Sequence, residues 1–75
     1  MSPRPPRLTA ADAIRAVKKA GFFLARQSGS HMIFKNAEGK RTTIPYHVGD
    51  ILHPKTLQSI IRDSGMTVEE FLEKT

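Results

Sequence analysis

Apolar and polar positions alternate with two different periods along this chain. Near the start, four apolar residues recur at helical spacing: Ala10, Ala13, Ile14 and Val17. Thr9 is a good N-cap residue, with Asp12 three residues later, and Gly21 is a typical helix terminator. The pattern predicts a helix over about residues 10–20.

Three short segments that follow have the composition of β-strands. They are Phe22–Gln27, His31–Lys35 and Lys40–Ile44, separated by a turn at residues 28–30 and a loop at residues 36–39. Connections this short join neighbouring antiparallel strands. We therefore expect a three-stranded antiparallel meander.

Helical spacing returns after an irregular segment, Pro45–His53. Pro54 suits a first helical turn and Gly65 an end, with Leu57, Ile60 and Ile61 as the buried stripe. Thr67 and Glu70 then form a capping box for a short last helix that buries three residues: Val68, Phe71 and Leu72. The expected fold class is α+β, in the order α-β-β-β-α, with the helices on one face of the sheet and the other face open.

The chain divides into an N-terminal arm and one domain. Residues 1–8 carry three prolines and two arginines and predict an extended, flexible arm, and residues 9–75 form a single small domain.

Without cysteine, neither a disulfide nor a cysteine-based zinc site can form. No apolar segment is long enough to cross a membrane or to serve as a signal peptide, so we expect a cytoplasmic protein without membrane contact.

Charge is distributed unevenly along the sequence. The chain has 12 Lys and Arg against 7 Asp and Glu, and four of the acidic residues lie after position 62. A polyanion such as RNA would therefore bind the first four-fifths of the chain, although a surplus of this size also occurs simply as a solvated surface.

His31 is the principal candidate for chemistry. Alternation along a strand would place His31 and Lys35 on the open face if Met32 and Phe34 face the helices. Imidazole exchanges protons near neutral pH and could serve as an acid or base toward RNA. The plain alternative is a polar residue at a strand edge. Three further cations could bind phosphate from neighbouring strands: Arg26, Lys40 and Arg41.

Other candidates are weaker. Ser30 adjoins His31, and a role in shaping the turn explains it better than a role as a nucleophile. His47 could supply a second acid or base if the loop reaches the start of the second strand. His47, His53 and His31 have no recognised metal-ligand spacing, so we expect no metal and no cofactor.

The last two predicted helices resemble a helix-turn-helix in layout. The would-be reading helix carries Glu69, Glu70 and Glu73, which would repel DNA phosphates. We expect no direct DNA binding.

Taken in order, the motifs resemble the HicA (YcfA-like) family of bacterial toxins. The matching elements are Gly21-Phe22, Gly29-Ser30-His31 with Ile33-Phe34, Ile44-Pro45-Tyr46-His47, Leu57 with Ile60 and Ile61, Gly65, and Val68-Glu69-Glu70-Phe71-Leu72. The similarity covers nearly everything after the arm. The position after His31, often polar in that family, is Met32 here.

The resemblance implies a fold like that of double-stranded-RNA-binding domains and a toxin of a type II toxin-antitoxin system. It also implies an mRNA endonuclease with His31 as the catalytic histidine, inhibited by a HicB-type antitoxin that covers this residue. The competing hypothesis from the residues is a non-catalytic RNA-binding domain.

Overall fold

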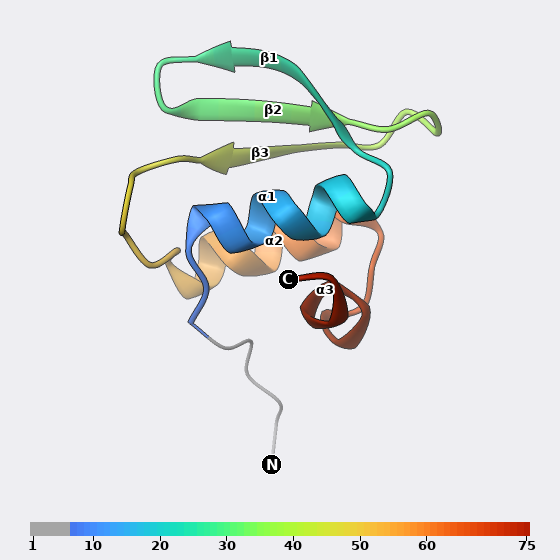
Figure 1. The fold of residues 1–75 in the computed structure, drawn as a ribbon. Helices are drawn as coiled ribbons and strands as arrows, with labels where there is room; N and C mark the ends of the chain where they lie inside the picture. Colours follow the sequence, from blue (N-terminus) through green and yellow to red (C-terminus); the bar gives the residue numbers. More distant parts are fainter. Residues whose placement is uncertain (1–6) are drawn as a thin grey trace.

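The computed structural model describes residues 7–75, and its elements follow the predicted order (Figure 1). They are α1 (Ala10–Lys19), β1 (Phe23–Ser28), β2 (His31–Lys35), β3 (Arg41–Pro45), α2 (Pro54–Ser64) and α3 (Val68–Lys74). The strands form one antiparallel sheet in the order β1-β2-β3. The α+β class and the meander are confirmed.

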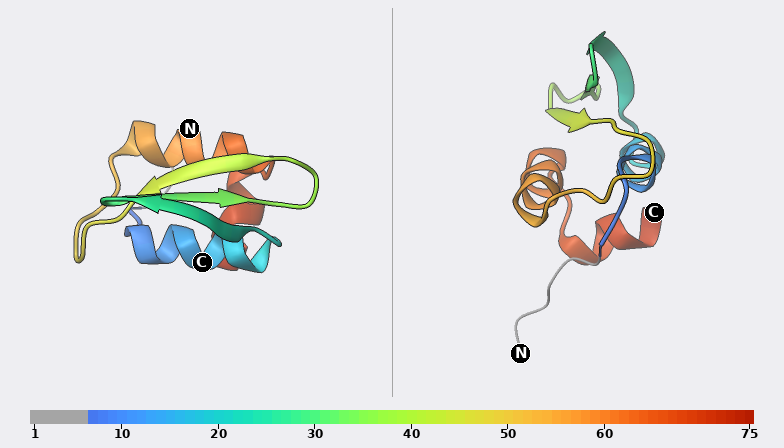
Figure 2. Two further views of the ribbon diagram at one scale, coloured as in Figure 1. Left: turned by 90° about the horizontal axis from the view of Figure 1, so that it is seen from above. Right: turned by 90° about the vertical axis from the view of Figure 1, so that its left-hand side faces the viewer.

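The three helices lie on one side of the sheet and leave its other side open (Figure 2). α1 and α2 run side by side, and both contact β3. β1 lies farthest from the helices, and all six of its residues are exposed. The β1–β2 hairpin therefore projects beyond the helical layer and presents an uncovered face.

The core lies between the sheet and the helices. Phe34 and Ile44 contribute from the strands, and the other large apolar side chains that are less than 2% exposed are Val17, Leu57, Ile60 and Phe71. Burial of Phe34 and partial burial of Met32 confirm that these residues face the helices. The predicted stripe of α2 is confirmed as well, because Leu57, Ile60 and Ile61 are all buried.

Two strands, β1 and β3, each begin and end one residue later than predicted. Phe22 is buried in the core and its N–H donates to the Val17 carbonyl at 2.9 Å, so β1 begins one residue later. β1 also continues to Ser28, which pairs with His31. β3 begins after Lys40, because the Lys40 N–H donates to the Asn36 side-chain oxygen at 2.8 Å inside the loop.

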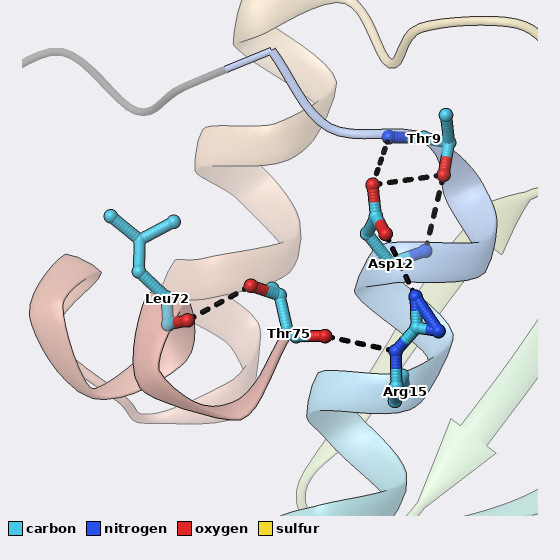
Figure 3. A network of polar contacts seen from close by, with 5 residues as sticks. All are labelled: Thr9, Asp12, Arg15, Leu72 and Thr75. Carbon is cyan, nitrogen blue, oxygen red and sulfur yellow. Dashed lines mark hydrogen bonds and ion pairs between the residues drawn. The ribbon is translucent and has the colours of Figure 1, made fainter.

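Both predicted capping boxes are present. Thr9 accepts from the Asp12 N–H, and the Asp12 carboxylate accepts from the Thr9 N–H at 3.0 Å (Figure 3). Thr67 and Glu70 make the same reciprocal pair at the start of α3. At each of these two helix starts, the N–H groups of the N-cap and N3 residues are thus satisfied by side chains.

A polar contact ties the end of the chain to α1. The Arg15 guanidinium donates from Nε to the Thr75 carbonyl oxygen at 2.9 Å and pairs with Asp12 (Figure 3). Because Thr75 also donates to the Leu72 carbonyl, this contact fixes the end of α3 against α1.

The packed domain includes Leu8, which lies in the core and whose carbonyl accepts from the Leu52 N–H at 2.7 Å. The adjacent residue, Thr9, forms an isolated bridge with Ile51. The segments that precede α1 and α2 are therefore held together. The first six residues of the predicted arm lie outside the described part of the chain.

Candidate functional site

His31 opens β2 and is exposed. It pairs with Ser28 on β1 and with Pro45 on β3. Among the side-chain hydrogen bonds within residues 7–75, none involves its imidazole. The strand pairs on both sides hold the backbone of His31 and leave the ring available to a ligand.

The open face of the sheet is organised in three rows that cross the strands. The first row holds Ser28, His31 and Pro45, and the next holds Arg26, Ile33 and Thr43. The third row holds Phe23, Lys35 and Arg41. Directly paired residues of antiparallel strands point to the same face. His31 and Lys35 therefore share the open face, as alternation predicted.

A β-bulge decides where Arg26 points. Leu24 pairs with Phe34 and Arg26 pairs with Ile33, which leaves Ala25 as an extra residue between two successive pairs. In a regular strand without a bulge, alternation from Phe23 would send Arg26 toward the helices. The bulge instead places Arg26 on the open face beside Lys35.

Arg26, Lys35 and Arg41 line a shallow cleft of about 250 Å³ on the open face, together with Ala25 and Ile33. All three cations are exposed, and none takes part in an ion pair within residues 7–75. Three positive charges at one cleft without acidic partners attract an anion. We refer to these three residues as the cationic cluster.

Lys40, the remaining predicted phosphate contact, is directed elsewhere. Its ammonium lies against Gly65, at the C-terminal end of α2, and makes a 3.8 Å ion pair with Glu38. A cation near a helix C-terminus is favoured by the helix dipole. The structure thus separates Lys40 from the other three cations.

Ser30 lies in the two-residue turn that precedes His31. Gly29 has a φ of 57° and Ser30 does not have a positive φ, as expected for a type II′ hairpin turn. The Ser30 carbonyl accepts from the Tyr46 N–H at 2.7 Å, which extends the β2–β3 pairing beyond the strand ends. The turn therefore holds the start of β2 against the loop that follows β3.

That loop forms a second cleft of about 260 Å³ at one end of the sheet. Its lining includes His47, Asp50 and His53, and also Pro45, the β3 partner of His31. The structure places His47 in a cleft adjoining the His31 row rather than in that row. His53 has a structural contact, because its Nδ1 accepts from the Lys55 N–H at the start of α2.

No three His, Cys, Asp or Glu side chains gather closely enough to hold a metal ion anywhere in residues 7–75. His47 and His53 line the same loop cleft, and His53 also caps α2, whereas His31 lies at the start of β2.

The acidic side chains of α3 lie away from the open face. Glu69, Glu70 and Glu73 are exposed, and hydrogen bonds from Thr67 hold the pKa of Glu70 below its usual range. Because α3 lies on the helical side, its negative charge does not oppose an anion at the cationic cluster.

Phe23 is the remaining member of the third row, and the sequence patterns did not identify it as a candidate site residue. It is 55% exposed and lies directly opposite Lys35. The Gly21-Phe22-Phe23 run gave no sign of which aromatic ring is buried. Only the strand register separates a core Phe22 from a surface Phe23.

Much of the chain, including the sheet, matches a known protein family. The family model described as "HicA toxin of bacterial toxin-antitoxin" matches residues 10–66, which span α1, the whole sheet and α2. No curated protein matches the chain. In residues 7–75, no helix has the length and apolar character needed to span a membrane. Since the match covers well over half of the sequence, the chain belongs to the HicA toxin family of bacterial toxin-antitoxin systems.

Proposed function

We propose that this toxin is an endoribonuclease that cleaves mRNA without a metal ion, with His31 as its acid/base residue. The observation that carries the proposal is the exposed imidazole of His31 on the same open face as the cationic cluster. Cleavage of a phosphodiester requires a proton acceptor and positive charge near the phosphate. The open face offers an acceptor at His31 and a cation, Arg26, in the adjacent row, with Lys35 and Arg41 one row farther.

In the proposed reaction, a ring nitrogen of His31 accepts the proton of a ribose 2′-hydroxyl. The 2′-oxygen then attacks the adjacent phosphorus, and the bond from phosphorus to the 5′-oxygen of the next nucleotide breaks. The leaving 5′-oxygen takes up a proton, and the products are a 2′,3′-cyclic phosphate and a 5′-hydroxyl end. Cations of the cluster would stabilise negative charge along the RNA backbone.

The proton for the leaving oxygen comes from water or from His47. His47 is supported by its cleft, which shares Pro45 with the His31 row. Ser30 is the weaker accessory residue, because its position in the turn already accounts for it. We also propose that a HicB-type antitoxin inhibits the toxin by covering His31, and that both act in the cytoplasm, where mRNA is found.

The decisive experiment is cleavage of a defined RNA oligonucleotide in the presence of a chelator. Wild-type protein should yield a 2′,3′-cyclic phosphate end, and His31→Ala should lose cleavage while still binding the RNA. An otherwise identical oligonucleotide with a single 2′-deoxy sugar at the cleaved position should resist. His47→Ala should slow the reaction if His47 is the acid and leave it unchanged if water is.

Unchanged cleavage by His31→Ala would exclude His31 as the acid/base residue, and loss of cleavage with chelator would establish a metal mechanism instead. If the wild-type protein binds RNA and cleaves none, the non-catalytic RNA-binding hypothesis is favoured. A matched control is His53→Asn, which removes a second imidazole but keeps a good helix N-cap residue.

A further inference from the structure

We propose that the open face binds single-stranded RNA and that Phe23 stacks on a nucleobase beside the cationic cluster. This inference rests on the proposed function and adds a base-binding position that Phe23 and the bulge at Ala25 create together. It specifies the substrate as a strand with at least one unpaired base on one side of the cleaved bond.

Strand pairing fixes the position of Phe23. Its pairing with Lys35 places it on the open face, and 55% of its surface is exposed. The next residue, Leu24, pairs with the buried Phe34 and so points to the helical side, where it is 43% exposed. Two exposed apolar residues of one strand therefore face opposite ways, and only Phe23 shares a face with His31.

Positive charge surrounds the ring of Phe23. Phe23, Lys35 and Arg41 form one row across the sheet, and Arg26 lies in the next row. Protein surfaces that bind single-stranded nucleic acid combine aromatic side chains, which stack on bases, with cations that follow the phosphate backbone. An exposed aromatic ring bordered by three cations that have no acidic partner in residues 7–75 has this combination. A ring that served only to cover the core would be buried, as Phe22 is.

The distance between the Phe23–Lys35 pair and His31 fits a short segment of RNA. Lys35 and His31 are four residues apart on β2, which corresponds to about 13 Å along the strand. Stacked nucleotides advance by about 3.4 Å each, so this span accommodates about four stacked nucleotides, or fewer in an extended strand. A base on Phe23 and a scissile phosphate at His31 can thus belong to one short segment of RNA.

The bases of a duplex stack on one another and leave no face for an aromatic side chain, whereas unpaired bases are free to stack on protein. The surface therefore fits single-stranded RNA. A protein partner on the same surface is the competing occupant, and the experiment below distinguishes the two.

The test measures binding of fluorescent single-stranded RNA to the full-length chain in the His31→Ala background, so that no cleavage interferes. Phe23→Ala and Phe23→Leu should each weaken binding by about tenfold, because both remove the stacking surface. Phe23→Trp should bind at least as tightly as Phe23. Leu24→Ala is the matched control, since it removes an exposed apolar side chain from the other face, and it should leave binding within about twofold.

Charge contributions are tested by the salt dependence of the same binding. Arg41→Gln should reduce the slope of log affinity against log salt by about 0.7, the value for one phosphate contact of a single strand. Its matched control is Lys40→Gln, the neighbouring cation that lies against Gly65, which should leave the slope unchanged. A duplex of the same sequence should compete poorly with the single strand.

Equal binding by Phe23→Leu and the parent protein would overturn the proposal, as would equal losses in Phe23→Ala and Leu24→Ala. Loss of antitoxin binding in Phe23→Ala with unchanged RNA binding would assign the surface to the protein partner, and would also overturn it. Far-UV circular dichroism of each variant verifies the fold. If the wild-type protein cleaves no RNA but Phe23 governs its binding, the nuclease proposal fails and this inference stands.

Discussion

Thr42 provides a sharp test of how the sheet packs on the helices. It lies on the helix-facing side of β3, opposite Phe34, and only 1% of it is exposed. Its hydroxyl oxygen has no hydrogen-bond partner in the part of the chain that the structure describes. We therefore expect Thr42→Val to stabilise the protein.

The magnitude follows from the desolvated hydroxyl. Burying such a group without a hydrogen bond costs about 1–3 kcal/mol in proteins. Valine has nearly the same shape and is also β-branched, so strand preference and packing change little. With allowance for local relaxation, Thr42→Val should raise the free energy of unfolding by about 1 kcal/mol, and the melting temperature of so small a domain by about 4–8 °C.

Urea unfolding followed by far-UV circular dichroism measures this change. Thr43→Val is the matched control, because Thr43 is exposed on the open face, and it should shift stability by less than about 0.5 kcal/mol. Thr42→Ser keeps the hydroxyl and removes the methyl group, and should cost about 1 kcal/mol. A destabilised or unchanged Thr42→Val would contradict this expectation and would mean that the hydroxyl donates to a partner in solution.

Two further predictions concern the helix caps and the turn before His31. Hydrogen bonds from Thr9, followed by the one from Arg15, hold the pKa of Asp12 below its usual range. A lowered folded-state pKa means that the stabilisation is complete above the unfolded value of about 3.9 and is lost as pH falls through the folded value. The gap in urea midpoint between wild type and Asp12→Asn should therefore narrow as pH falls below about 4 and close once pH passes below the lowered folded-state pKa, and a gap that stays constant would contradict the pKa shift. Gly29→Ala should lower the free energy of unfolding by about 1–2 kcal/mol, because the added methyl contacts nothing but the positive φ strains the backbone; an unchanged urea midpoint would show that the turn adopts another conformation.

Much of this fold could be predicted from local sequence signals. Thr9 with Asp12, and Thr67 with Glu70, define helix starts through contacts three residues apart. Pro54 and Gly65 bound α2 at the predicted residues. Such signals depend on neighbours along the chain, so they can be read without knowledge of the rest of the molecule.

The candidate site depended on a mixture of local and distant contacts. His31 and Lys35 could be assigned to one face from β2 alone, because side chains alternate along a strand. Lys40 was grouped with them by proximity to Arg41 in sequence. The structure separates the two, since Lys40 lies outside β3 and its side chain lies against Gly65.

Local sequence patterns define the order of the elements, the helix boundaries at the caps, and the face of β2 that carries His31. Strand pairing and packing select Phe22 rather than Phe23 for the core, and the bulge at Ala25 places Arg26 on the open face. The physical reason is that periodicity and capping act within a few residues, whereas register, bulges and burial arise from pairing between strands and packing against helices.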